Sequence, residues 1–204
     1  MAGAAAGIVT NTNTTCTEVH FAEKSIQTTV TDDGHVVENW VNQQTGQEIV
    51  GFDMEWRPSF QRGWENDTAL LQLCTDNGCL IIQMLFLDFI PEALVSFLKD
   101  PGVKLVGVGI ERDAAKLMND HGLECGGQVE LGALAAEKLE RRELKQAGLK
   151  GLAKEVLGLR LSKPKSISMS NWAWAILQHR QIQYACIDAF VSLAIGKKLM
   201  ESEN

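Results

Sequence analysis

The stretch Ile49-Val50-Gly51-Phe52-Asp53-Met54-Glu55-Trp56 places two carboxylates in an otherwise apolar segment. Its composition predicts a buried strand over residues 48–54. Side chains alternate between the two faces of a strand, so Asp53 and Glu55 should point to the same side. Acidic side chains without nearby bases are ligands for hard divalent cations. We therefore expect this strand to carry part of a metal site.

A second pair of polar residues lies in Tyr184-Ala185-Cys186-Ile187-Asp188-Ala189. Apolar spacing of three and four over residues 181–200 predicts a helix there. Residues i and i+4 of a helix are about 5–6 Å apart between their Cβ atoms, so Tyr184 and Asp188 should share a face. Asp113 lies in the first turn of another predicted helix. If the fold brings these five residues together, they make a two-metal nuclease site.

The rest of the chain alternates between strand and helix patterns. β-Branched and apolar runs predict strands at residues 17–21, 25–31, 68–75, 79–84, 103–108 and 129–131. Helical spacing predicts helices at residues 36–42, 90–98, 111–120, 131–139 and 149–157. Asp32-Asp33-Gly34 should cap the first of these helices, and Ser170 is a candidate N-cap before Trp172. The fold class is therefore α/β, with an antiparallel meander in a central mixed sheet of five to six strands flanked by helices.

Length and charge indicate one domain with an uneven charge distribution. The 204 residues suit a single domain over residues 17–204, after a flexible N-terminal segment of residues 1–16. The net charge is −7, yet residues 138–165 hold nine Lys and Arg against three Glu, which leaves −13 for the remainder. A basic segment beside an acidic site suits a phosphate-backbone substrate. Solvated helix faces are the alternative explanation of the same segment.

The cysteines and the apolar runs indicate an intracellular protein. Five scattered cysteines form no CxxC pair, which points to reduced thiols, and zinc between Cys74 and Cys79 is disfavoured. No run of 18 apolar residues predicts a membrane span. Residues 1–15 lack the pattern of a secretory or transit signal. We expect the protein in the cytoplasm, the nucleus or both, without a membrane partner.

Taken in order, these motifs resemble the 3′-5′ exonucleases of the DEDD superfamily, which have a ribonuclease H-like fold. The similarity covers about residues 48–200 and is to the Werner-syndrome-type exonuclease domain and to the small plant RISC-interacting clearing 3′-5′ exoribonucleases. Beyond the two motifs above, the shared segments are Leu71-Gln72-Leu73-Cys74, Gly107-Val108-Gly109-Ile110-Glu111-Arg112-Asp113, Lys165-Ser166-Ile167 and Ser170-Asn171-Trp172. Tyr184 indicates the tyrosine (DEDDy) subgroup, because the histidine subgroup would have His at Gln183. Many members also carry an Asn upstream of the middle aspartate, where this chain is Gly-rich.

The resemblance implies a metal-dependent hydrolysis at two Mg²⁺ or Mn²⁺ ions. Asp53 would bridge both ions, and Glu55 and Asp188 would hold the ion that activates water. Asp113 would fix the second ion, and Tyr184 would orient the attacking water. Four carboxylates at one point repel each other, so their pKa values should be raised while no ion is bound.

Several other residues are candidates for substrate contacts. Aromatic side chains at Trp56, Phe60 and Trp64 would stack on terminal bases, with Met54 beside them, although Trp56 suits core packing equally well. A polar, basic loop would contact phosphates through Lys163, Lys165, Ser166 and Ser168, although a solvated loop fits the same residues.

The expected substrates are 3′ ends of single-stranded RNA or DNA. RNA is favoured only through the likeness to the plant exoribonucleases, and a Werner-type DNA exonuclease is the alternative. A non-catalytic nucleic-acid-binding scaffold is a further alternative, which the intact five-residue set argues against. A homo-oligomer would join a basic stretch of one subunit to the acidic site of another, and an Argonaute or other RISC component is a candidate partner.

Overall fold

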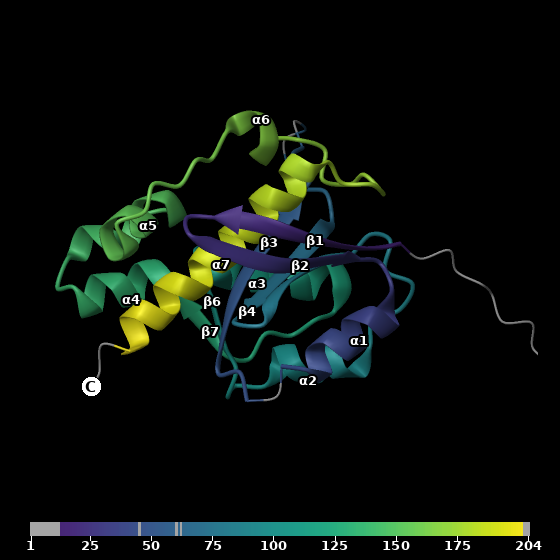
Figure 1. Cartoon of the computed structure of the whole chain (residues 1–204), viewed down its shortest axis with the longest axis horizontal. Helices are drawn as coiled ribbons and strands as arrows, with labels where there is room; N and C mark the ends of the chain where they lie inside the picture. Colours follow the sequence, from purple (N-terminus) through teal and green to yellow (C-terminus); the bar gives the residue numbers. More distant parts are fainter. Residues whose placement is uncertain (1–12, 45, 60, 62, 202–204) are drawn as a thin grey trace, which may run out of the picture.

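A mixed sheet of seven strands forms the centre of the molecule in the computed structural model, which describes residues 13–201 except 45, 60 and 62. The strands are β1 (Thr14–Phe21), β2 (Lys24–Thr31), β3 (Ile49–Trp56), β4 (Thr68–Thr75), β5 (Gly78–Gln83), β6 (Lys104–Gly107) and β7 (Gln128–Glu130). Their order across the sheet is β1-β2-β5-β4-β3-β6-β7 (Figure 1). The helices around it are α1 (Gly34–Asn42), α2 (Glu92–Lys99), α3 (Ile110–His121), α4 (Leu131–Lys138), the 3-10 helix η1 (Arg142–Gln146), α5 (Leu149–Leu157), α6 (Lys165–Ser168) and α7 (His179–Met200).

The predicted meander is confirmed, and the sheet extends beyond it on both sides. β3 pairs antiparallel with β4, and β4 pairs antiparallel with β5. β6 lies parallel to β3, and β7 lies parallel to β6. The sheet has seven strands instead of the five to six expected. The N-terminal hairpin of β1 and β2 joins the same sheet, because residues 28–31 of β2 pair in parallel with residues 79–82 of β5.

The first strand also corrects the predicted N-terminal boundary. β1 begins at Thr14, so residues 14–16 of the segment expected to be flexible belong to the sheet. These residues continue the ladder with β2, where Thr14 is opposite Thr31 and their hydroxyl oxygens are 2.7 Å apart. Residues 1–12 of that segment lie outside the described residues.

Helices α1, α2 and α3 pack with one face of the sheet, and α1 and α2 lie side by side (Figure 1). The even-numbered residues Phe52 and Met54 of β3 are buried in this layer. As predicted, Asp33 caps α1, and its carboxylate accepts a 2.8 Å hydrogen bond from the backbone N–H of His35. This face therefore carries one of the apolar core clusters of the domain.

The long helix α7 runs across the opposite face and carries Tyr184 and Asp188 (Figure 1). It begins at His179, two residues before the predicted start, because Gln178 and Gln181 form a reciprocal capping box. The predicted helix start at Ser170 is wrong. The Ser170 hydroxyl instead accepts a 3.0 Å hydrogen bond from the side-chain amide of Gln181, which ties this segment to α7. Helices α4 and α5 pack beside α7 in a third apolar cluster.

Gly51 allows α7 to approach the sheet closely. A Cβ atom at Gly51 would lie 2.0 Å from the backbone oxygen of Ala189, a distance that no side chain tolerates. On the helix side, a Cβ atom at Gly196 would lie 2.8 Å from a methyl group of Val106. The two glycines let helix and sheet backbones come near each other, which brings Asp188 next to the carboxylates of β3.

Two further expectations concern the cysteines and the membrane. Cys74 and Cys79 are neighbours across β4 and β5, and all five cysteines are free thiols, as the sequence predicts. Within the described part of the chain, no helix combines the length and the apolar character that crossing a membrane requires.

Candidate active site

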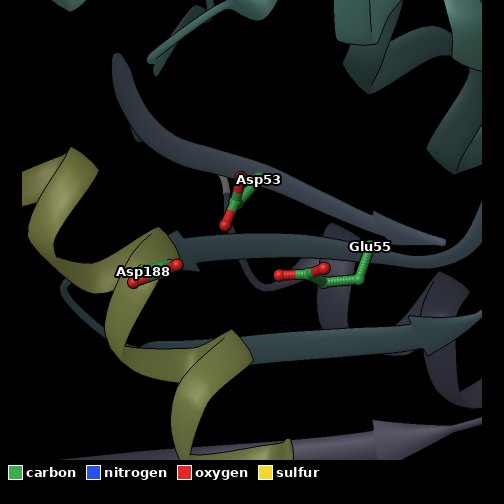
Figure 2. A group of neighbouring side chains, drawn as sticks. All are labelled: Asp53, Glu55 and Asp188. Carbon is green, nitrogen blue, oxygen red and sulfur yellow. The ribbon is translucent and has the colours of Figure 1, made fainter. Parts of the chain in front are cut away.

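Three carboxylates converge between strand β3 and helix α7. Asp53 and Glu55 project from the same face of β3, and Asp188 reaches toward them from α7 (Figure 2). One carboxylate oxygen from each residue lies within 4.8 Å of the other two. The strand spacing and the helix position predicted from the sequence therefore meet at one point, although Glu55 and Asp188 are 133 residues apart in the chain.

The pKa values of all three carboxylates are raised, as the sequence predicts. Burial among protein atoms is the largest cause for each, although Asp53 and Glu55 keep part of their surface in solvent. For Asp53 the next cause is the charge of Asp188, and for Glu55 it is the charge of Asp53. Mutual repulsion therefore adds to desolvation at Asp53 and Glu55, and the charge of Lys163 lowers both pKa values without cancelling the rise.

Asp113 lies in the first turn of α3, outside the group of three but close enough for its charge to raise the pKa of Asp53. Burial raises the pKa of Asp113 itself to about 6. The helix begins in a left-handed turn at Gly109, with φ +75°. The Glu130 carboxylate accepts hydrogen bonds from the N–H groups of Gly109 (2.6 Å) and Ile110 (3.1 Å). Glu130 thus fixes the helix start from which Asp113 projects.

Tyr184 and Asp188 share one face of α7, as the i,i+4 spacing predicts. The Tyr184 hydroxyl lies close enough to the Asp188 carboxylate to lower the pKa of Asp188. Burial and the three nearby carboxylates raise the pKa of the Tyr184 hydroxyl, which keeps it protonated. The buried Trp172 ring lies 5.8 Å from the Tyr184 ring, centre to centre, and limits its movement. Tyr184 is therefore a fixed hydroxyl donor at the edge of the carboxylate group.

Lys163 is the basic residue that reaches this group. Its Nζ atom lies 2.6 Å from Oδ2 of Asp188 and 5.5 Å from the centre of the Tyr184 ring. Oδ2 of Asp188 is buried and has no well-directed hydrogen bond among the described residues, so the contact with Lys163 is a charge contact. The ammonium lowers the pKa of Asp188, yet burial keeps that pKa raised.

The other predicted substrate contacts lie in different surroundings. The Met54 side chain is in the apolar core, because the strand period turns it to the face opposite Asp53, and its assignment to substrate binding is wrong for the side chain. Trp56 packs on that core beneath two cations, with Lys116 Nζ 5.2 Å and Arg112 Cζ 5.8 Å from its ring. Trp64 is 63% exposed, and Phe60 lies outside the described residues.

The short helix α6 holds the remaining candidates of the polar loop. Lys165 and Ser166 are exposed on this helix. The backbone oxygen of Ser168 accepts a 3.2 Å hydrogen bond from the indole of Trp172, which gives this turn a structural role.

Sequence reasoning missed two supports of the site. Gly51 is needed for the approach of α7, and Trp172 backs Tyr184. Both residues lie in motifs that the sequence comparison already singles out. Their roles depend on the packing of distant segments, for which a local pattern gives no signal.

The donor set fits divalent metal ions. All the converging ligand atoms are carboxylate oxygens, which Mg²⁺ and Mn²⁺ prefer. The buried Oδ2 of Asp188 lacks a directed hydrogen bond, and the raised pKa values show uncompensated negative charge. Asp53, Glu55 and Asp188 could therefore hold metal ions, with Asp113 nearby.

Comparison with known proteins gives a consistent result. The model of a family described as 3′-5′ exonuclease matches residues 28–202. The mouse bifunctional 3′-5′ exonuclease/ATP-dependent helicase WRN is 39% identical over 74% of this chain and 11% of its own length. The chain also spans only about half the length of the Arabidopsis thaliana 3′-5′ exonuclease, with 33% identity over 78% of this chain.

Among solved structures, Escherichia coli RNase D matches with a TM-score of 0.71 and 22% identity, over 84% of this chain and 44% of that one. This likeness confirms the ribonuclease H-like exonuclease fold that the sequence predicts. An EXD2 exonuclease domain whose crystal was soaked in Mn matches with a TM-score of 0.50 and 27% identity, over 85% of this chain and 88% of that one.

Proposed function

The chain belongs to the 3′-5′ exonuclease family, and on that premise we propose that it hydrolyses phosphodiester bonds from the 3′ ends of single-stranded nucleic acid. The convergence of Asp53, Glu55 and Asp188 next to a fixed Tyr184 hydroxyl carries this proposal. A group of carboxylates without charge balance has no evident structural benefit, whereas it is what a metal-dependent nuclease needs.

In this proposal the residues have separate tasks. Asp53, Glu55 and Asp188 hold the metal ions, and Asp113 helps to hold the second of two ions from α3. When bound, Mg²⁺ or Mn²⁺ lowers the pKa of coordinated water and neutralises charge on the phosphate. The protonated Tyr184 hydroxyl orients the attacking water by a hydrogen bond. The Mn-soaked EXD2 domain supports this choice of metal.

A cavity of about 340 Å³ beside Tyr184 and Asp188 suits the sugar-phosphate backbone of the substrate. Three side chains that are cationic or can become so line it, namely His20, Arg160 and Arg180. Arg160 also lines a second cavity together with Lys150 and Lys154. We propose that Lys150, Lys154 and Arg160, which belong to the basic segment, guide phosphates toward the carboxylates. The part of the segment around Arg141 has another use, because Arg141 is paired with Glu143 and Glu155.

We also propose that Trp64 stacks on a base of the substrate. Trp64 and Trp56 line a cavity of about 540 Å³ on the loop that follows β3. An exposed indole beside the end of the catalytic strand suits base stacking, which tolerates any sequence.

RNA is the proposed preferred substrate, and its support is the likeness to the small plant exoribonucleases. The Werner-type DNA exonuclease is the second candidate, and the 39% identity to mouse WRN favours it. Two further proposals are self-association and an Argonaute or RISC component as partner, in the cytoplasm or the nucleus. The exposed apolar side chains of Trp174 and Ile176 support self-association, and a monomer in light scattering would reject it.

The test is a time course on matched RNA and DNA oligonucleotides labelled at the 3′ or the 5′ end, with Mg²⁺. A 3′ label should be released first, and a 5′-labelled substrate should shorten stepwise. EDTA and the variant Asp53→Asn should both abolish degradation. Full degradation in EDTA, or by the variant, would reject the proposed function. The ratio of the RNA and DNA rates decides between the two substrates.

A further inference from the structure

Lys163 faces all three converging carboxylates. Its ammonium is 2.6 Å from Asp188, and its charge also acts on Asp53 and Glu55. The Lys163 side chain is 31% exposed, whereas that of Asp188 is only 3% exposed, so the lysine reaches inward from the surface. It provides positive charge at the position where a metal ion would be held.

The chain positions Lys163 through its neighbours. The loop begins at Gly158, which ends α5 in the left-handed conformation with φ +69°. The side chain of Leu161 is then buried in the cluster of α4, α5 and α7 and anchors the loop. Pro164 follows directly and precedes α6. Lys163 lies between Leu161 and Pro164, and its side chain extends to Asp188 of α7.

One ammonium is a poor substitute for metal ions. It carries a single charge against three carboxylates, and Oδ2 of Asp188 obtains no well-directed hydrogen bond from it. A divalent ion carries twice the charge and binds several oxygens directly. An ammonium 2.6 Å from an Asp188 oxygen repels a divalent ion that binds the same oxygen, so the two cations compete for it.

Resting on the metal site proposed above, we infer that Lys163 is a resident counter-cation, which divalent ions must displace from Asp188 when they bind. Displacement removes the charge contact that holds the outer part of the loop. The residue thereby lowers the affinity for metal and couples metal binding to the freedom of residues 159–164.

The first experiment measures Mn²⁺ binding by calorimetry with the full chain. We expect Lys163→Met to bind Mn²⁺ about tenfold more tightly than the natural protein, because no ammonium has to leave. Lys165→Met is the matched control. It removes the same charge from an exposed position two residues away, and its Mn²⁺ affinity should stay within about twofold of the natural protein.

The second experiment needs no variant and therefore does not depend on whether Lys163→Met folds. Hydrogen exchange of residues 159–164 should become faster when Mn²⁺ is added to the natural protein, whereas exchange in α7 should become slower. An unchanged or weaker Mn²⁺ affinity of Lys163→Met, or unchanged exchange in the loop, would overturn the role of Lys163. Absence of Mn²⁺ binding by the natural protein would instead reject the metal site itself.

Discussion

Two aspartates of this protein with buried side chains each contact a lysine, yet their environments shift their pKa values in opposite directions. Asp120 on α3 and Asp188 on α7 both have side chains that are 3% exposed. Lys116 lies 2.9 Å from Asp120, and Lys163 lies 2.6 Å from Asp188. The pKa of Asp120 is lowered to about 2, whereas that of Asp188 is raised.

The difference lies in the other partners of each carboxylate. Burial raises the pKa of Asp120, but hydrogen bonds from Lys116 and from the N–H and hydroxyl of Thr68, both 2.8 Å long, outweigh it. For Asp188 burial is the largest cause and outweighs the lowering effects of Lys163 and Tyr184, and its Oδ2 lacks a directed hydrogen bond. A satisfied buried carboxylate stabilises the fold, whereas an unsatisfied one marks a binding site.

The largest expected difference between the two aspartates is in catalysis. Asp188→Asn should lower exonuclease activity by about a thousandfold or more, because an amide is a poor metal ligand. Asp120→Asn should keep activity within about tenfold at a temperature where it is folded. Initial rates on a labelled oligonucleotide with Mg²⁺ measure both. Comparable losses of activity in the two variants would contradict the assignment of Asp188 to metal binding and of Asp120 to the fold.

For the free energy of unfolding the order is reversed, since substitution of Asp120 should have the larger effect. In EDTA at neutral pH, Asp120→Ala should cost about 3 kcal/mol, because Lys116 loses its nearest carboxylate and the N–H and hydroxyl of Thr68 lose their acceptor. Asp188→Asn should be at least as stable as the natural protein, since its ionised form is disfavoured in the fold.

Urea denaturation gives both values, and Asp76→Ala is the control. Asp76 forms an exposed ion pair with Lys197, so its loss should cost less than about 1 kcal/mol. A destabilised Asp188→Asn would indicate that Asp188 supports the fold as Asp120 does.

The shift in melting temperature on metal binding should differ by a few degrees between the Asp120 and Asp188 variants. Mn²⁺ at about 100 times its dissociation constant contributes about 2.7 kcal/mol of stability. It should therefore raise the melting temperature of the natural protein and of Asp120→Asn. Asp188→Asn should show little or no shift. An equal shift in Asp188→Asn would place the ion elsewhere.

The smallest expected effect is on the pH dependence of stability without metal. Asp113 has a folded pKa of about 6 against an ordinary value of 3.8, so it destabilises the fold progressively as the pH rises from about 4 through 6. Asp120, with a folded pKa of about 2, stabilises above about pH 4, and that contribution is lost as the pH falls toward 2.

Stability in EDTA should therefore be greatest near pH 4–5. Denaturation curves at several pH values test this, and Asp113→Asn should flatten only the side above pH 4. A stability that keeps rising to pH 7 in EDTA would contradict the raised pKa of Asp113.

The local geometry of the site could be predicted from the amino-acid sequence. The strand period places Asp53 and Glu55 on one face, the helix period places Tyr184 and Asp188 on one face, and Asp33 caps a helix as expected. Such spacings are properties of the backbone and need no knowledge of distant segments. The order of the motifs then indicated the exonuclease family, and with it the fold.

The way in which the strand and the helices meet depends on packing between distant segments. The tertiary structure showed that Gly51 allows α7 to reach β3, that Met54 is turned into the core, and that Lys163 rather than Lys165 contacts Asp188. It also placed the N-terminal hairpin in the sheet and the Ser170 side chain against Gln181 instead of at a helix start. These outcomes depend on distances between segments far apart in the chain, which packing fixes and which no local periodicity encodes.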